Sequence, residues 1–153
     1  MTIFPWQKKK EFFTAEEKRL IVNAIQEAER MTSGEVRVFV ESKCSYMDAI
    51  DRAAEIFFKL QMQSTDDRNA VLVYIAMNDH QLAVFGDEGI HKRVGNDFWK
   101  AEVEKMIKNF NRGNYAEGIS DVVKDIGDAL NKHFPYVAST DKNELPDDIV
   151  FGK

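Results

Sequence analysis

Apolar residues recur along the chain with two different periods, and each period predicts one kind of secondary structure. Over residues 14–31 they return every three or four positions, which is typical of one face of an α-helix. Thr14 and Glu17 have the spacing of a capping box, so we expect the helix to begin there. The helical spacing returns in three further segments, residues 46–63, 99–110 and 119–130.

Three shorter segments have the pattern of β-strands. In residues 35–41 every second side chain is a valine, which places Val36, Val38 and Val40 on one face of a strand. Residues 70–77 are apolar on both faces and too short for a typical helix, which indicates a central strand that is buried on both sides. A tight turn at Asn78-Asp79 then leads into a third strand over residues 80–86.

This order of elements predicts an α/β fold, a three-layer αβα sandwich around a small mixed β-sheet. The first two strands are expected to be parallel with a right-handed crossover, and the second and third to form an antiparallel hairpin. We assign residues 12–137 to this single domain and residues 138–153 to an acidic C-terminal tail. Two alternatives remain for the tail: a disordered end, or a strand near Ile149–Phe151 that docks on the domain.

Composition narrows the class of protein. The chain has 153 residues, with 21 Lys and Arg against 26 Asp and Glu and a net charge of −5. Because this balance is acidic, we expect no nucleic-acid partner.

Neither a membrane span nor a signal peptide is predicted. The longest apolar run, residues 70–77, is far shorter than the roughly 20 residues that span a bilayer. No signal-peptide pattern opens the chain, so we expect no membrane insertion and a cytoplasmic location. A single cysteine, Cys44, excludes an internal disulfide. We expect a monomer, with an unidentified protein as its partner.

The predicted topology gathers acidic residues at one end of the sheet. A tight turn between the second and third strands sets Asp87 opposite Ala70. Asp66 and Asp67, which precede the second strand, then meet Asp87 and Glu88, which follow the third. Carboxylates brought together in this way repel one another unless positive charge lies among them.

Three arrangements would satisfy these acids. They could face water in a solvated turn, they could form ion pairs with Arg68, Lys92 or Arg93, or they could bind a divalent cation. An all-oxygen set of ligands suits calcium or magnesium rather than zinc, although the spacing is not that of an EF-hand. Asp97 lies ten residues beyond the first acid after the third strand and could fold back as a further ligand.

Five stretches of the chain, in this order, resemble the TPM domain family in a stand-alone bacterial form: TSGEVRV, DDRNAVLVYIA, GDEGIHKRVGNDFW, NRGNYAEGISDVVKDIG and NELPDDIVFG. The resemblance covers residues 12–151. It implies an αβα sandwich in which two loops cross near a divalent-metal site, and an association with acid-phosphatase activity.

Two motifs of the family carry the resemblance at the acidic end of the sheet. The R-N-x-V-L motif is matched by Arg68, Asn69, Val71 and Leu72, and the G-D-x-G-I motif by Gly86, Asp87, Gly89 and Ile90. The chain departs from the family at Ala70, where members often have glycine, and Glu88 occupies a position that varies in type. These motifs lie in the two segments that the strand register brings together.

The sequence thus leaves three functions: a divalent-metal-binding regulatory or interaction module, a metal-assisted acid phosphatase (phosphomonoesterase), and a structural protein whose acids pair with Arg68 and Lys92. We favour the first, with calcium ahead of magnesium, and expect any phosphatase activity to be weak. No catalytic residue is identified, because no phosphatase loop follows Cys44, and we interpret His91 as a surface histidine and Trp99 as core. The predicted metal ligands are Asp66, Asp67, Asp87, Glu88 and Asp97.

Overall fold

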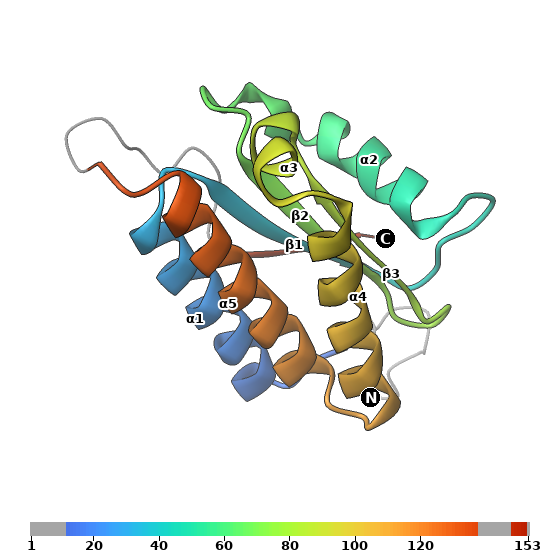
Figure 1. The fold of residues 1–153 in the computed structure, drawn as a ribbon. Helices are drawn as coiled ribbons and strands as arrows, with labels where there is room; N and C mark the ends of the chain where they lie inside the picture. The colour runs from blue at the N-terminus through green and yellow to red at the C-terminus, as the bar shows by residue number, and fades with distance from the viewer. Residues whose placement is uncertain (1–11, 138–147, 153) are drawn as a thin grey trace, which may run out of the picture.

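A computed structural model describes residues 12–137 and 148–152 of the chain, and its elements form one four-stranded mixed sheet with helices packed against it (Figure 1). In chain order the elements are α1 (Ala15–Met31), β1 (Glu35–Glu41), α2 (Ala49–Lys59), the 3₁₀ helix η2 (Met62–Ser64), β2 (Ala70–Ala76), β3 (Gln81–Gly86), α3 (Glu88–Val94), α4 (Asn96–Asn111), α5 (Tyr115–His133) and β4 (Ile149–Phe151). None of the helices in these described ranges is long and apolar enough to cross a membrane.

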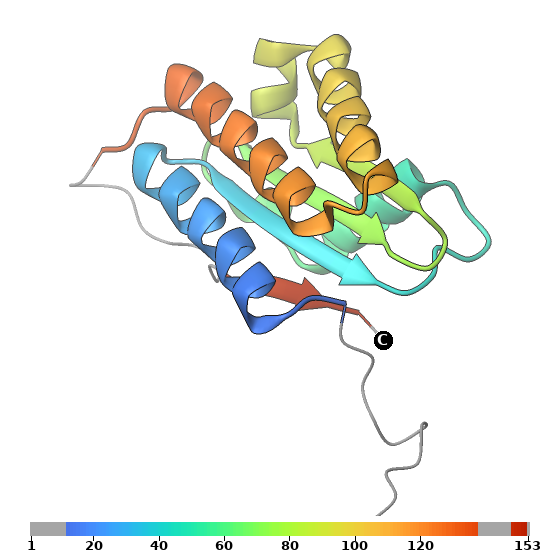
Figure 2. The same ribbon diagram turned by 90° about the horizontal axis from the view of Figure 1, so that it is seen from below.

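The sheet lies between two helical layers, so the predicted αβα sandwich is confirmed. The strand order is β3-β2-β1-β4, with β1 parallel to β2 and β3 antiparallel to β2. Helices α1, α4 and α5 cover one face, and α2 covers the other (Figure 2). All seven residues of β2 are buried, as expected for a central strand with helices on both sides.

The start of α1 follows directly from its sequence. The Thr14 hydroxyl accepts a hydrogen bond from the Glu17 amide at 3.1 Å, and the Glu17 carboxylate accepts one from the Thr14 amide at 2.8 Å. This is the predicted capping box, which satisfies two backbone donors at the helix start. One face of the helix then buries Ile21, Ala24 and Ile25 against the sheet and α5.

The hairpin has the predicted register, but its turn is longer than predicted. The last pair of the ladder is Ala76 with Gln81, so the connection has four residues instead of two. His80 closes it with a left-handed backbone (φ 54°). The pairing still sets Asp87 opposite Ala70, because the longer turn adds one residue to each side; the Asp87 amide donates to the Ala70 carbonyl at 2.9 Å.

Three segments differ from the sequence prediction. The second helix ends at Lys59, short of the predicted residue 63, because Gln61 adopts a left-handed backbone (φ 58°) and a 3₁₀ turn follows. Residues 88–94, expected as a loop, form α3, and Gly95 (φ 80°) separates this helix from α4. Of the two alternatives for the tail, residues 149–151 form the docked strand, β4, parallel to β1; residues 138–147 lie outside the described ranges.

Candidate functional site: two crossing segments at the end of the sheet

Two backbone segments cross at the end of the sheet where β2 begins and β3 ends: the pre-β2 segment (residues 65–69) and the post-β3 segment (residues 86–90). The Gly89 amide donates to the Arg68 carbonyl at 2.8 Å. A Cβ atom at Gly89 would lie 2.1 Å from the Asp67 carbonyl oxygen and 2.6 Å from that of Arg68. Only glycine therefore allows the two backbones to approach this closely.

Asp87 is the buried centre of this crossing. It is the N-cap of α3, where its carboxylate accepts a hydrogen bond from the Glu88 amide at 2.8 Å. The same carboxylate receives two bonds from the Arg68 guanidinium, Nε to Oδ2 at 2.6 Å and Nη2 to Oδ1 at 2.8 Å. The Asp87 side chain is 3% exposed and the Arg68 side chain 38%. The bidentate ion pair therefore lies at the edge of the crossing, with its carboxylate buried and its guanidinium partly in contact with solvent.

The backbone of Arg68 directs its side chain into this pair. Its φ is 52°, in the left-handed region that a non-glycine residue adopts at a cost. The hydrogen bonds to Asp87 raise the pKa of Arg68, so the guanidinium carries its charge throughout the physiological range. Arg68, Lys92 and Arg93 were the three basic side chains predicted to pair with these acids, and Arg68 is the one that does so in the described residues. In the described residues Lys92 forms no ion pair with these acids, and Arg93 lies over the ring of Phe134, 5.2 Å from its centroid.

The other predicted ligands are nearer to solvent. Asp66 and Asp67 are exposed on the pre-β2 segment, and exposed Glu88 lies 3.5 Å from Nη1 of Arg68. Asp97 is exposed in the first turn of α4, and within the described ranges no hydrogen bond or ion pair joins it to the other four. The structure thus brings four of the five acids to the two crossing segments. Across residues 12–137 and 148–152, no three Asp, Glu, His or Cys side chains are arranged around a common point that would suit a metal ion.

Sequence reasoning named Asn69 as part of a family motif but not as a site residue; it is 1% exposed at the same end of the sheet. Its backbone amide donates to the Thr65 hydroxyl at 3.2 Å, and its Nδ2 donates to the Ser33 hydroxyl at 3.3 Å. Its Oδ1 is buried and receives no hydrogen bond from the described residues. A buried carbonyl oxygen without a donor is costly unless water or a cation satisfies it. The feature of the sequence that could have indicated this role is the position of Asn69, an amide residue directly before the wholly apolar strand β2.

The prediction for Trp99 is confirmed, and that for His91 is wrong. Trp99 is 8% exposed and packs under Gly86, where a Cβ would lie 2.3 Å from its Cζ2 atom. The indole Nε1 donates to Nδ1 of His91 at 3.0 Å, so His91 is a partly buried acceptor that anchors α3 to α4. The sequence could not show this contact because the ring spacing depends on the turn at Gly95.

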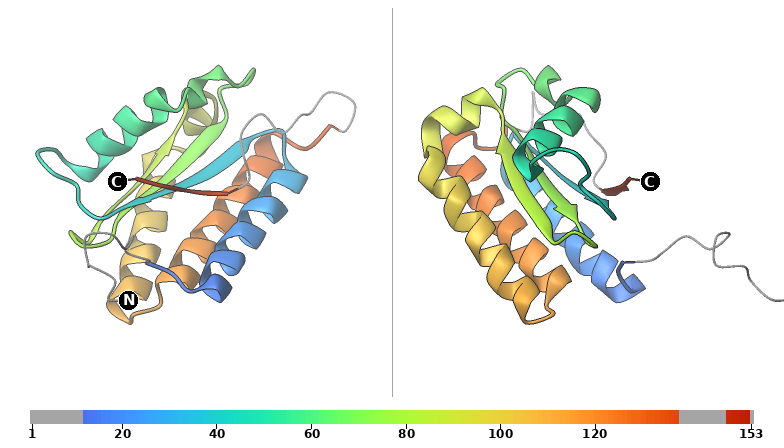
Figure 3. Two further views of the ribbon diagram at one scale, coloured as in Figure 1. Left: turned by 180° about the vertical axis from the view of Figure 1, so that it is seen from behind. Right: turned by 90° about the vertical axis from the view of Figure 1, so that its right-hand side faces the viewer.

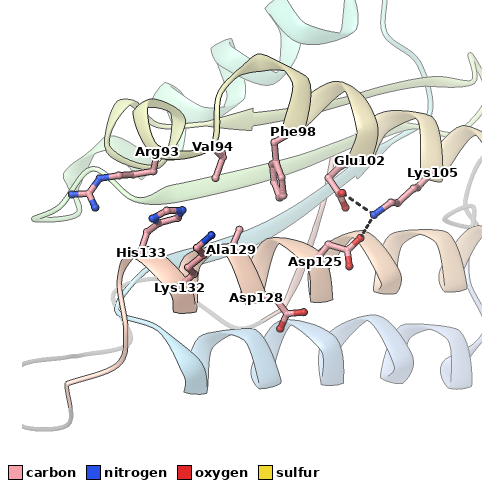
Figure 4. A pocket seen from close by; sticks show the side chains of 10 residues that line it. All are labelled: Arg93, Val94, Phe98, Glu102, Lys105, Asp125, Asp128, Ala129, Lys132 and His133. Carbon is pink, nitrogen blue, oxygen red and sulfur yellow. Dashed lines mark hydrogen bonds and ion pairs between the residues drawn. The ribbon is translucent and has the colours of Figure 1, made fainter.

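A second polar feature is the cleft between α4 and α5, with a volume of about 530 Å³ (Figure 4). Glu102 is 2% exposed on its wall. Lys105 Nζ bridges Glu102 Oε2 at 3.1 Å and Asp125 Oδ2 at 2.7 Å, while Oε1 of Glu102 receives no hydrogen bond from the described residues. Burial, and then the hydrogen bond to Asp125, raise the pKa of Glu102 to about 7. The burial of Glu102 could have been inferred from its position three residues after Trp99, which places it beside the apolar residues of the helix.

This shifted pKa predicts a pH-dependent stability that Glu102→Gln removes. Because the folded protein binds the Glu102 proton more tightly than the unfolded chain, the contribution of Glu102 to stability is fully present below about pH 4.5 and is lost as the pH rises through about 7. The neutral amide reproduces the protonated state. We expect the variant to exceed the wild type in free energy of unfolding by about 2 kcal/mol at pH 8 and to match it at pH 4.5.

Urea unfolding at both pH values measures this difference, with exposed Glu104→Gln on the same helix as the control. The account of Glu102 is wrong if the two variants respond to pH alike.

By its fold the chain is an α/β protein with a four-stranded mixed sheet. At one end of this sheet two acidic segments cross, and the crossing requires glycine at position 89. The chain belongs to the TPM domain family, whose sequence profile matches residues 7–129. The resemblance drawn from the sequence is therefore confirmed.

The solved structures that are similar to this chain include the following two. The BA42 protein of the psychrophilic bacterium Bizionia argentinensis shares 41% identity with a TM-score of 0.85, over 95% of this chain and 99% of that one. The N-terminal domain of the cg2496 protein from Corynebacterium glutamicum has the same fold at 12% identity and a TM-score of 0.61, over 78% and 74% of the two chains. No curated protein sequence matches the chain significantly.

Proposed function

We propose that this protein is a divalent-cation-binding interaction module, with calcium as the preferred ion and magnesium as the second, and with the ion held at the crossing segments. The observation that carries the proposal is the charge at the crossing. Asp66, Asp67, Asp87 and Glu88 lie on two segments in backbone contact, and Arg68 is the one cationic side chain that binds any of them among the described residues. The excess negative charge favours a cation.

The donor chemistry fits a hard cation, whereas the present arrangement of side chains does not yet enclose one. Asp66, Asp67 and Glu88 are exposed carboxylates with free lone pairs, which is the oxygen chemistry that calcium and magnesium prefer. Asp87, in contrast, is already bound by Arg68 and by the α3 N-terminus. The exposed acids would therefore supply the first ligands. The proposed site does not use Asp97, whose ligand role stays a prediction from the sequence.

Arg68 gives such a site a means of regulation. Its guanidinium binds Asp87 through two nitrogens and lies near Glu88 through the third. A cation at these carboxylates and the guanidinium compete for the same oxygens, because both are attracted by the same negative charge. Cation binding is therefore expected to loosen the Arg68 side chain and to change the surface that the module presents to a partner.

Thermal unfolding tests the proposal. Because an ion that binds only the folded state stabilises it by about 2.7 kcal/mol at a hundredfold excess over Kd, calcium is expected to raise Tm by roughly 5–10 °C relative to excess chelator. The double variant Asp66→Asn/Asp67→Asn should lose this increase. A matched control, Asp51→Asn/Asp121→Asn, removes the same charge from exposed positions on α2 and α5 and should keep it. Equal responses of the two double variants would contradict the proposal.

The phosphomonoesterase has less support than the cation-binding module. Such an enzyme needs a positive clamp on the phosphoryl oxygens, and the one guanidinium at the crossing is held by Asp87. We therefore expect hydrolysis of a chromogenic phosphate ester, with calcium, magnesium or manganese at acidic and neutral pH, to stay far below about 1 per second. A turnover at or above that rate, lost in Asp66→Asn/Asp67→Asn, would make the protein an enzyme.

A further inference from the structure

An apolar groove runs along the free edge of the sheet, on the side of the molecule away from β4. Strand β3 is the edge strand there, and it lies between α2 and α4 (Figure 3, right). The groove has a volume of about 330 Å³. Its floor is Leu82, Ala83 and Val84, one wall is Ile50 of α2, and the other wall is formed by α4 residues Trp99, Lys100, Val103 and Glu104.

The backbone of β3 presents hydrogen-bonding groups to this groove. In an antiparallel pair, successive residues direct their N–H and C=O groups alternately toward the partner strand and away from it. The Asp87 amide bonds to Ala70 of β2, so residues 81, 83 and 85 face β2 and residues 82, 84 and 86 face outward. Among the described residues no strand lies on the outer side of β3, because the sheet order ends there, so the outward groups of Leu82 and Val84 have no partner strand.

This edge lacks the features that usually protect an edge strand from pairing. Strand β3 contains no charged residue and no proline, and helix α2 places exposed apolar side chains beside it. Ile50 and Phe58 are each 48% exposed, and the Phe58 ring lies 6.1 Å from that of Phe85. An apolar strip beside unpaired backbone groups is the typical receptor for an added strand.

The walls of the groove determine what fits into it. Side chains of α2 and α4 line its two sides, so β3 is recessed between them. A single extended segment, without helices of its own beside it, is narrow enough to lie between these two helices. Pairing of β3 with the β3 strand of a second copy is the competing arrangement that the experiment below distinguishes.

Charges on α4 specify the sequence of that segment. Lys100 and Glu104 are one helical turn apart, about 6 Å along the axis, and alternate residues of a strand are about 6.7 Å apart on one face. Because Trp99 packs under Gly86, α4 runs antiparallel to β3, with Lys100 nearer to Gly86 and Glu104 nearer to Leu82. An antiparallel segment would thus place an acidic residue at Lys100 and, two positions later, a basic residue at Glu104.

We propose that this groove binds an extended segment of a partner protein, which adds to the sheet as a strand antiparallel to β3. An acid-x-base pair in the segment matches Lys100 and Glu104, and the apolar residues between and beside the pair lie against Ile50. This inference is independent of cation binding at the crossing segments, which lie at one end of the sheet, whereas the groove lies along its edge.

The probe is the peptide acetyl-Val-Glu-Val-Lys-Val-amide, titrated into ¹⁵N-labelled protein in calcium and, separately, in chelator. We expect saturable shifts and slower hydrogen exchange at the amides of Leu82 and Val84 in both conditions. The same peptide N-methylated at its Glu and Lys amides keeps its side chains but loses two donors to β3, and should not bind. Equal binding of the two peptides would overturn the proposal.

Charge reversal tests the register. Lys100→Glu should weaken binding about tenfold, which corresponds to about 1.4 kcal/mol, while Lys108→Glu, an exposed position on the same helix outside the groove, should leave it unchanged. The charge-swapped peptide, with Lys before Glu, should bind the Lys100→Glu/Glu104→Lys protein as tightly as the original pair. No saturable shift at millimolar peptide, or dimerisation of the protein through Leu82 and Val84 in sedimentation and NMR dilution experiments, would overturn the proposal.

Discussion

Asp87→Ala is expected to lower the free energy of unfolding by about 3 kcal/mol, the largest loss for any acid at the crossing. The substitution leaves the Arg68 guanidinium without its bidentate partner and removes the N-cap of α3, a loss of about 1 kcal/mol by itself. The two charge-assisted hydrogen bonds from Arg68 account for about 2 kcal/mol more. The full cost of a buried, unpaired charge does not apply, because the Arg68 side chain is 38% exposed and reaches water in the variant.

Chemical denaturation measures this loss, and two variants separate its causes. Asp87→Asn keeps a side-chain acceptor for the Glu88 amide but not the negative charge, so it should recover about 1 kcal/mol. Glu88→Ala removes an exposed acid 3.5 Å from the same guanidinium and should cost less than about 0.5 kcal/mol. If Asp87→Ala costs no more than Glu88→Ala, the pair with Arg68 does not hold the crossing together.

Gly89→Ala is expected to destabilise the protein by about 3 kcal/mol because the added methyl group collides with backbone. The atoms it would meet are the carbonyls of Asp67 and Arg68, at 2.1 and 2.6 Å, and neither can rotate away as a side chain could. The two segments must therefore separate, which also breaks the hydrogen bond from the Gly89 amide.

The control is Gly113→Ala. Gly113 has φ 80° with open space around its Cβ position, so alanine there is strained only through the backbone and should cost about 1 kcal/mol. Because the collision at Gly89 moves the pre-β2 segment, Gly89→Ala should weaken calcium binding as well, whereas Gly113→Ala should not. Equal stabilities of the two alanine variants would show that the segments are not packed as described.

Much of the fold was predictable because local patterns and tertiary structure agree. The Thr14 capping box, the helical stripe of α1 and the doubly apolar β2 each specify one element without reference to the rest of the chain. The hairpin register was predicted from a two-residue turn at Asn78-Asp79. The observed connection has four residues but the same centre, so the pairing is unchanged. For this reason the meeting of the two acidic segments could be inferred before the structure.

The rest depends on contacts that periodicity does not encode. Helix α3 has seven residues, fewer than the window of about 11 residues in which helical periodicity can be recognised. Its acidic start also has the composition of a solvated turn. The choice of Arg68 over Lys92 depends on a left-handed backbone at Arg68, and the burial of Glu102 depends on how α4 packs on α5. Asn69 is recognisable as a site residue only when its neighbours in space are known.

The most direct test of cation binding at the crossing is a residue-resolved calcium titration of the full chain by ¹⁵N NMR. The account predicts that the amides of residues 66–69 and 87–89 shift together and saturate with one Kd, that magnesium does the same more weakly, and that Asp66→Asn/Asp67→Asn abolishes the response. Calcium that leaves these amides unmoved at millimolar concentration, or that shifts only amides around another acidic group such as Glu102 and Asp125, would contradict it.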